Sequence, residues 1–384
     1  FRSILMWMRK PVTAMLKRIL PPLLLLGLML SLAAPAAAVP LRFDPAACED
    51  VGERAIAAGG PGELTADCLA MIETFPRPPH ISVEQDRYTL SEYSFWKVGP
   101  DAIPTFNGPG GGVIGEIASG FNFVRAVDLS VEGWLQIEGG AWIQRELATY
   151  VAASQFTGVT LLTDLEYPFA WILDLSRIFV SEYPGGPSST ATERWLQRYE
   201  MVNIFSVAYD AEGWRWYMIG PNQWVKQTFV AKVQRTERPE EVEGRWVAVD
   251  LYEQTLVAYE DGTPVFATLI SSGLPATETN EGIFNVWARL PRDGMSGAAG
   301  APNAYALQSV PWVMYFDGGI SLHGTYWHDL FGYRRSRGCV NLSISDARWL
   351  FNWLLDGADY RDESVVNNVY VYSSGEYGVT ATGI

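Results

Sequence analysis

The sequence predicts a mostly β protein made of several domains, with one short helix late in the chain. Three observations predict this fold class. The chain has 384 residues, more than one ordinary domain holds. Short segments that alternate apolar and polar residues recur between turns rich in Gly, Asn and Pro over residues 88–374. Hydrophobic residues make up 48% of the chain and charged residues only 18%, a composition typical of folded domains.

The first 38 residues have the pattern of a targeting segment. Basic residues precede an apolar run over residues 19–34, and three alanines follow at 36–38, a pattern typical of signal-peptide cleavage. The alternative is a retained membrane anchor, because residues 19–38 are about long enough to cross a bilayer. Under either interpretation, we expect the body of the protein to lie outside the cytoplasm, in the cell envelope.

Charge and cysteine content narrow the classes of function. The net charge of -15 argues against binding to nucleic acid through bulk charge. Cys48 and Cys68 are close in sequence and are predicted to form a disulfide in an oxidising compartment. Cys339 is left over, and a lone exported thiol is a liability unless it is buried or used. The three His and three Cys are scattered, so we expect no metal site.

The middle of the chain contains two similar segments, residues 88–155 and 165–234. Each has a Gly-Trp pair, at 133–134 and 213–214, followed by a second Trp between short alternating strands. This spacing resembles bacterial SH3-like modules, which are small β-barrels. The alternative is that the two barrels act only as spacers. The other predicted segments are the targeting segment 1–38, the segment 39–87 with the disulfide and a Pro-rich linker, a charged linker 235–244, a C-terminal domain 245–374 and a tail 375–384.

The C-terminal domain is predicted to be mostly β with one helix. A hairpin turn is expected at 261–262, and residues 293–304, rich in Gly, Ala and Ser, are expected to form a mobile loop. A helix is expected over 346–355, with Ser343 or Ser345 near its cap. Strands are expected at 246–251, 255–260, 265–270, 282–287, 310–316, 319–323 and 368–372.

His323 and Cys339 form the candidate catalytic pair. His323 ends a predicted strand, and Cys339 follows Gly338, where the backbone can approach a substrate closely. An imidazole beside a thiol can take its proton and so activate the sulfur as a nucleophile. The backbone N–H groups of Gly338 and Cys339 are candidate oxyanion donors. On spacing alone, a strand-end histidine and a buried core cysteine would give the same pattern.

The residues around this pair resemble the L,D-transpeptidase (YkuD-like) catalytic domain. The resemblance covers about residues 245–373 and rests on His-Gly-Thr at 323–325 and Ser-Arg-Gly-Cys-Val-Asn-Leu at 336–342. It implies a β-sandwich in which Cys339 is the nucleophile, His323 the general base and the carbonyl of Gly324 the group that orients the imidazole. It also implies neither a metal nor an organic cofactor. The residues to which it gives substrate contacts are Tyr315, Trp327, Ser336, Arg337, Asn341 and, near the lid, Met295.

The resemblance implies an enzyme that forms peptidoglycan cross-links. Together with the targeting segment, it predicts an exported enzyme of the cell envelope, which we expect to be a monomer. Cys339 would take the acyl group of a tetrapeptide stem, and stem peptides would be its partners. An L,D-carboxypeptidase, a transferase that attaches proteins to the wall, and a non-catalytic wall-binding protein remain alternatives.

Arg337 departs from the family pattern, in which many members have His immediately before Gly-Cys. Arginine stays protonated and cannot act as a base. We therefore expect it either to lower the pKa of the thiol or to bind a stem carboxylate. His328, between the two halves of the motif, is expected to be a solvated loop residue.

Overall fold

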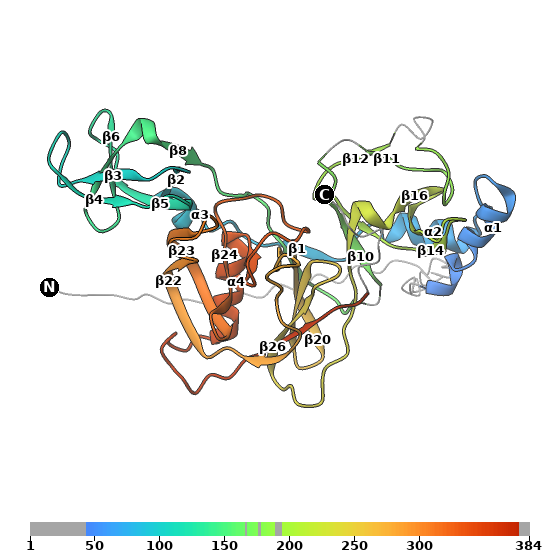
Figure 1. Ribbon diagram of the computed structural model, residues 1–384. Helices are drawn as coiled ribbons and strands as arrows, with labels where there is room; N and C mark the ends of the chain where they lie inside the picture. The colour runs from blue at the N-terminus through green and yellow to red at the C-terminus, as the bar shows by residue number, and fades with distance from the viewer. Residues whose placement is uncertain (1–43, 166, 176–177, 189–193, 376–384) are drawn as a thin grey trace, which may run out of the picture. The chain divides into compact units, whose positions relative to one another are not determined.

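The computed structural model describes residues 44–165, 167–175, 178–188 and 194–375 (Figure 1). The predicted targeting segment 1–38 and nearly all of the predicted tail 375–384 lie outside the described residues. Residues 43–384 belong to one compact unit. Within the described ranges, no helix is long and apolar enough to cross a membrane. The protein is mostly β, as the sequence predicts.

The described chain begins with a small helical segment that the sequence patterns did not predict. It contains a 3₁₀ turn η1 (Pro45–Cys48) and helices α1 (Val51–Ala58) and α2 (Ala66–Thr74), and a disulfide joins Cys48 to Cys68. The Thr65 hydroxyl caps α2 by accepting the N–H of Cys68. The apolar faces of these helices pack against aromatic residues of the 165–234 segment, among them Trp216 and Trp224.

Residues 88–155 form a small barrel-like set of strands after helix α3 (Arg87–Glu92). Strand β2 (Ser94–Val98) pairs with both β5 (Phe121–Asp128) and β8 (Ala148–Val151). The 3₁₀ turn η2 (Arg145–Leu147) precedes the last strand. The other strands are β3 (Ile103–Phe106), β4 (Val113–Ile117), β6 (Trp134–Ile137) and β7 (Trp142–Gln144).

Residues 165–234 repeat this pairing pattern. Strand β10 (Phe169–Ile172) pairs with both β13 (Met201–Asn203) and β17 (Val230–Val233), and the 3₁₀ turn η4 (Gln227–Phe229) again precedes the last strand. In both segments the first strand therefore pairs with a middle strand and with the last strand. The remaining strands are β11 (Ile178–Phe179), β12 (Trp195–Leu196), β14 (Ser206–Tyr209), β15 (Arg215–Gly220) and β16 (Gln223–Lys226).

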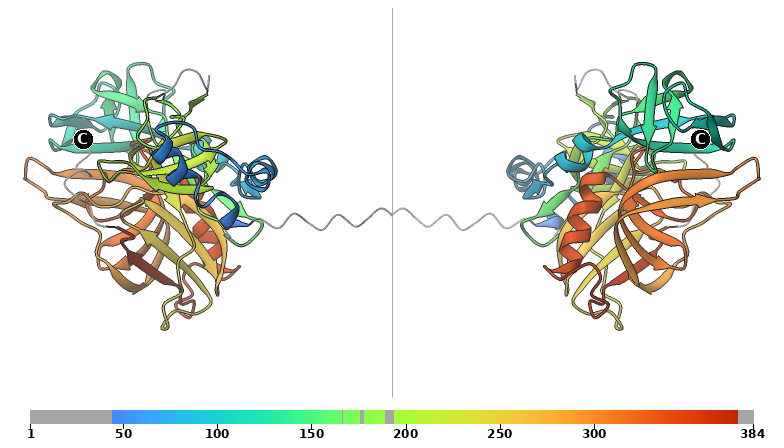
Figure 2. Two further views of the ribbon diagram at one scale, coloured as in Figure 1. Left: turned by 90° about the vertical axis from the view of Figure 1, so that its right-hand side faces the viewer. Right: turned by 90° about the vertical axis from the view of Figure 1, so that its left-hand side faces the viewer.

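The C-terminal domain packs two sheets and one helix around a shared core. The first sheet has the order β1-β9-β20-β19-β18-β26-β21, and the second includes β25, β24, β23 and β22. Helix α4 (Ile344–Leu355) packs on β23 and β24, as Figures 1 and 2 show. The strands are β1 (His80–Ser82), β9 (Val159–Leu161), β18 (Arg245–Asp250), β19 (Thr255–Glu260), β20 (Thr263–Leu269), β21 (Gly282–Asn285), β22 (Ala288–Gly297), β23 (Tyr305–Asp317), β24 (Ile320–Gly324), β25 (Val340–Leu342) and β26 (Asn368–Tyr372).

The central strands of the first sheet are buried on both faces. On β18, Val247 and Val249 face the core shared with α4, whereas Trp246 and Ala248 face a second core. That second core contains Phe169 and other residues of the 165–234 segment. Since side chains alternate along a strand, burial on both faces explains why these strands are almost continuously apolar. The 165–234 segment thus packs directly on the C-terminal domain.

Most predicted elements of this domain are confirmed, including the 261–262 turn, the Ser343 cap and a helix over residues 344–355. The mobile loop expected at 293–304 is wrong. Residues 293–297 belong to β22, and β22 pairs with β23 as a long hairpin whose connecting loop covers only 298–304. The residues of this part of β22 alternate in exposure, as expected for a strand. The prediction relied on the Gly, Ala and Ser content, which does not reveal this alternation.

Candidate active site

Strands β24 and β25 present one polar and one apolar face. They pair in parallel with His323 opposite Asn341, and β23 places Tyr315 opposite Ser321. Leu322, Val340 and Leu342 point into the core. Because side chains alternate along a strand, the polar residues of these strands share the opposite face. The residues on that face are Tyr315, Ser321, His323, Cys339 and Asn341.

The imidazole of His323 is held in one tautomer. Its Nδ1 lies 3.2 Å from the carbonyl oxygen of Gly324, and a carbonyl can only accept a hydrogen bond. Nδ1 therefore carries the proton, and Nε2 keeps the lone pair that a general base needs. Burial lowers the pKa of His323 to about 4, with the Gly324 bond opposing that shift. The ring is neutral at neutral pH and ready to accept a proton.

The thiol of Cys339 is half-buried and hydrogen-bonded. The Ser321 hydroxyl lies 3.7 Å from Sγ, and Sγ lies 3.9 Å from the carbonyl oxygen of Gly319. Burial raises the pKa of the thiol, and the bonds from Ser321 oppose the rise. The resting pair is therefore a neutral thiol and a neutral imidazole, and the proton moves when the substrate is attacked. Ser321 was not among the predicted site residues, although its position two residues before His323 on a strand places both on one face.

The loop that carries the nucleophile is braced by hydroxyl groups. Ser336 Oγ accepts the N–H of Gly338 at 3.1 Å and donates to the carbonyl of Cys339. Thr279, not predicted, donates to the Gly338 carbonyl at 2.7 Å. Ser336 thus braces the loop in this structure, and its contact with substrate stays a prediction. The Gly338 N–H is already bonded to Ser336 Oγ, so the N–H of Cys339 is the better placed of the two predicted oxyanion donors.

Gly338 is required by its backbone conformation. Its φ of 114° lies in the left-handed half of the map, where a side chain would be strained. The turn aims Cys339 onto the polar face of the strands.

Aromatic side chains surround the pair. The Trp327 ring lies 5.6 Å from the His323 ring, and the Tyr315 hydroxyl donates to Asp293 at 2.8 Å. Burial, followed by Asp293, raises the pKa of Tyr315, and the charge of a Cys339 thiolate adds to the rise. Met295 lies on β22 and packs in the same apolar cluster as Trp327. The structure thus brings Tyr315, Trp327 and Met295 to the site that the sequence predicted.

Arg337 points toward the β22–β23 hairpin. Its guanidinium lies 4.7 Å over the ring of Tyr305 and donates to the carbonyl of Asn303. The bonds that offset the effect of burial on the thiol pKa come from Ser321, so the geometry does not favour the interpretation of Arg337 as a group that lowers the thiol pKa. The alternative, a contact to a substrate carboxylate, remains a prediction, because the guanidinium is exposed and keeps further donors.

His328 is not the solvated loop residue that the sequence predicted. Its Nδ1 accepts the N–H of Leu330 at 3.2 Å, and its Nε2 lies 2.9 Å from the side-chain amide of Asn341. Burial, with nearby Arg335 and His323, lowers the pKa of His328 to about 3. The prediction failed because polar loop residues are usually solvated, and only the fold shows that this loop lies against Asn341.

The site places the thiol of Cys339 and the imidazole of His323 on one face of neighbouring strands, an arrangement that suits cysteine acyl transfer. No group of three or more His, Cys, Asp or Glu side chains is arranged to hold a metal ion within the described ranges. The family model for the YkuD L,D-transpeptidase catalytic domain matches residues 244–371. These residues form a cysteine-dependent L,D-transpeptidase catalytic domain. No curated protein matches the chain.

Several solved L,D-transpeptidases are similar to part of the chain. A mutant of the Enterococcus faecium L,D-transpeptidase is 28% identical, with 34% of this chain and 50% of that chain covered and a TM-score of 0.29. The Stackebrandtia nassauensis enzyme is 26% identical, with 36% and 58% covered and a TM-score of 0.26. The catalytic domain of the E. faecium enzyme is 27% identical, with 34% and 99% covered and a TM-score of 0.28. This chain thus spans about half the length of the first of these proteins.

Proposed function

We propose that the protein is an exported L,D-transpeptidase that forms peptidoglycan cross-links by acyl transfer from tetrapeptide stems. The observation that carries this proposal is the orientation of His323 by the Gly324 carbonyl, with Nε2 left free of a proton on the face that holds Cys339. A catalytic domain that had lost its activity would have no need to keep this tautomer and a thiol bonded to Ser321.

The first half of the reaction makes a thioester. Nε2 of His323 takes the proton of the Cys339 thiol as Sγ attacks the stem carbonyl carbon. The N–H of Cys339 stabilises the oxyanion that forms. The C–N bond to the terminal D-residue then breaks, and the leaving amine takes the proton from the imidazolium.

The second half transfers the acyl group. The amine of a neighbouring stem attacks the thioester carbonyl and gives its proton to His323. The C–S bond breaks, and the departing sulfur of Cys339 regains the proton from the imidazolium. Water in place of the amine would give a carboxypeptidase, and an amine on a protein would give a transferase that attaches proteins to the wall.

The segments before the catalytic domain support a role at the cell wall. Residues 88–155 and 165–234 share one pairing pattern, in which the first strand pairs with a middle strand and with the last. We propose that they are two SH3-like modules. Residues 1–38 are proposed to direct export or to anchor the chain, and the disulfide between Cys48 and Cys68 suits an oxidising compartment.

Product mass distinguishes the candidate activities. We would incubate the protein with a tetrapeptide stem and a stem carrying a free side-chain amine, and analyse the mixture by mass spectrometry. A product joining the two stems with loss of the terminal D-residue supports the transpeptidase. A trimmed tripeptide alone would indicate the carboxypeptidase instead. Absence of both, from a folded protein, would favour a non-catalytic wall-binding protein.

A further inference from the structure

The first SH3-like module is joined to the active-site hairpin by backbone pairing. Strand β5 runs parallel to the start of β23, with Phe121 opposite Tyr305 and Phe123 opposite Leu307. The Phe121 N–H donates to the Ala304 carbonyl at 2.9 Å. Gly120 permits this approach, since a Cβ there would lie 2.6 Å from that oxygen. The module therefore contributes a strand beside the hairpin that covers the site.

Phe121 and Tyr305 place two rings side by side on one face. Paired residues of neighbouring strands point to the same side of the sheet. The Lys97 ammonium lies 5.9 Å over the Phe121 ring, and the Arg337 guanidinium lies 4.7 Å over the Tyr305 ring. Phe121 is 40% exposed, and both cations are on the surface. We call these four residues, Arg337, Tyr305, Phe121 and Lys97, the cationic strip.

The cationic strip begins beside the nucleophile. Arg337 precedes Cys339 by two residues, and its guanidinium lies over the Tyr305 ring. A second row of rings runs from the module to the catalytic histidine. Phe121 lies 4.8 Å from Phe123, Phe123 lies 6.4 Å from Trp327, and Trp327 lies 5.6 Å from His323. This row of packed rings connects Phe121 of the strip to His323.

The chemistry of the strip selects an anionic peptide. Lys97 and Arg337 place two positive charges over neighbouring rings, in a chain whose net charge is -15. An exposed guanidinium binds a carboxylate through paired donors, an ammonium adds a point charge, and exposed rings pack on the peptide between them. We propose that the cationic strip binds the carboxylates of a stem peptide, so that the first SH3-like module forms part of the substrate site.

This inference rests on the proposed function, and Lys97 offers a test with a matched control. Lys226 lies 3.8 Å over the ring of Trp214 in the second module, so Lys226→Glu makes the same change elsewhere. The measurement is the ratio of kcat/KM for a tetrapeptide stem to the acylation rate constant for a carbapenem, which carries no stem. Lys97→Glu should lower this ratio about fivefold, because an exposed ion pair is replaced by repulsion. Lys226→Glu should leave it unchanged.

The outcomes separate the strip from the reaction. The proposal that the cationic strip binds the stem peptide would be contradicted by either of two results. One is the same ratio of rate constants in wild type and Lys97→Glu, and the other is an equal fall of this ratio in both lysine variants. If the wild type neither acylates nor turns over, the proposed function fails. In that case, the role of the strip in binding is tested by calorimetry, which measures the Kd of the tetrapeptide for wild type and for Lys97→Glu. A Kd about fivefold weaker in the variant supports it, and equal Kd values overturn it.

Phe121→Ala provides a second variant that does not change charge. It should lower the same ratio, and Phe121→Tyr, which keeps the ring, should restore it. Equal losses in the two variants would contradict a role for the ring in binding.

Discussion

The side-chain amide of Asn341 lies 2.9 Å from Nε2 of His328. Nδ1 of the same ring accepts the N–H of Leu330, so the neutral ring carries its proton on Nε2. Of the two ends of the Asn341 amide, only the oxygen can accept a hydrogen bond from this Nε2–H. The oxygen therefore faces His328, and the NH₂ group takes the opposite position. The amide's other position is buried and has no hydrogen-bond partner in the described part of the chain. His328 therefore fixes the orientation of the Asn341 amide, which lies opposite His323 on the neighbouring strand.

Removal of His328 should slow acylation without unfolding the protein. His328→Ala frees the Asn341 amide to rotate, and we expect the acylation rate constant for a carbapenem to fall about tenfold, the loss of one positioned hydrogen bond. His80→Ala is the control, because the Nδ1 of that ring bonds to the Pro78 carbonyl of its own segment, outside the site. Equal acylation rates in wild type and His328→Ala, at an unchanged Tm, would show that His328 has no part in acylation.

The pH dependence of acylation should show that the Cys339 thiol and the His323 imidazole are both neutral in the resting enzyme. Burial lowers the pKa of His323 to about 4, so the base is active above that pH and lost when the ring is protonated below it. Because burial also raises the pKa of Cys339, we expect no thiolate absorbance at neutral pH. The measurement is the acylation rate against pH together with ultraviolet titration of the thiol. A thiolate signal at neutral pH that disappears in His323→Ala would indicate a preformed ion pair instead.

Ser321 should help to activate the thiol. Ser321→Ala removes the hydroxyl that lies 3.7 Å from Sγ, and we expect the thiol pKa to rise and acylation to slow about fivefold. His323→Ala should abolish acylation. Alkylation rates measured against pH give the thiol pKa directly. Ser364→Ala, in an exposed turn, serves as the control. An unchanged alkylation profile in Ser321→Ala would show that this hydroxyl plays no part.

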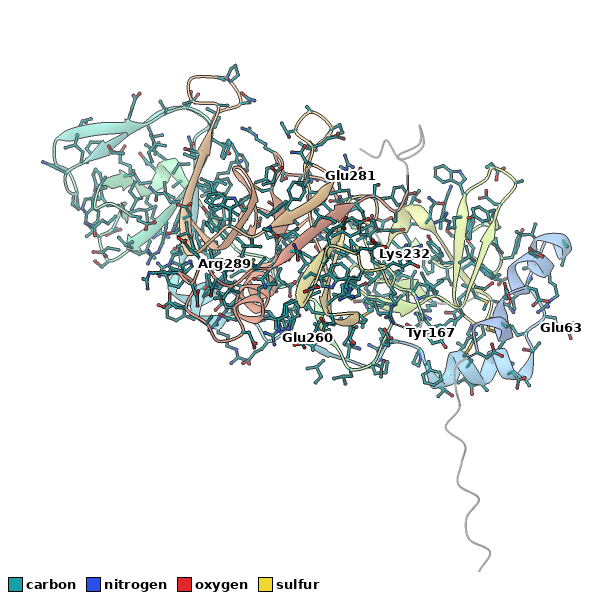
Figure 3. The ribbon with its side chains drawn as sticks, turned by 90° about the horizontal axis from the view of Figure 1, so that it is seen from below. Glu63, Tyr167, Lys232, Glu260, Glu281 and Arg289 are labelled. Carbon is teal, nitrogen blue, oxygen red and sulfur yellow. A yellow bond between two sulfur atoms is a disulfide. The ribbon has the colours of Figure 1, made fainter. Side chains whose placement is uncertain are left out.

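Glu253 should make stability depend on pH. Glu253 is buried where the 165–234 segment meets the catalytic domain. Its carboxylate accepts the backbone N–H of Lys232, and Lys232 is labelled in Figure 3. Burial raises its pKa from 4.5 to about 7, against the bond and charge of Lys232. The folded protein therefore holds this proton more tightly than the unfolded chain. The stabilisation is complete below pH 4.5 and is lost as the pH rises through about 7.

Glu253→Gln tests this dependence. The variant keeps an acceptor for Lys232 and removes the titration, so the fall in unfolding free energy across this window, about 3 kcal/mol, should disappear. Glu260→Gln is the control, since that carboxylate is exposed and pairs with Arg245 at the surface. Denaturant titrations at several pH values measure the slope. The same slope in wild type and Glu253→Gln would contradict the assignment.

The sequence predicted the parts of the fold that follow local rules. Strands β18 to β20 and β26 are apolar and bounded by turns, and α4 has a Ser343 cap followed by Asp346 at the cap-box position. The pair of His323 and Cys339 followed from the family motif. Local patterns could not predict that β5 would pair with β23, because pairing between segments so far apart depends on the tertiary fold.

The missed site residues share one physical reason. Thr279 and Tyr305 lie outside the His-Cys motif, and His328 lies in the loop between its halves. Each becomes part of the site only when tertiary contacts bring it to the nucleophile loop, the hairpin or Asn341. A sequence window contains no signal for such contacts. The bond from the Gly338 N–H to Ser336 is likewise visible only in the structure.

The most direct test of the central claim is mass spectrometry of the intact protein after incubation with a carbapenem. We expect a covalent adduct of one carbapenem, mapped to the peptide that contains Cys339, because the thiol lies on one strand face with the oriented His323. Cys339→Ala should carry none. An unmodified wild-type protein, shown to be folded by circular dichroism, would contradict the assignment of Cys339 as the catalytic nucleophile.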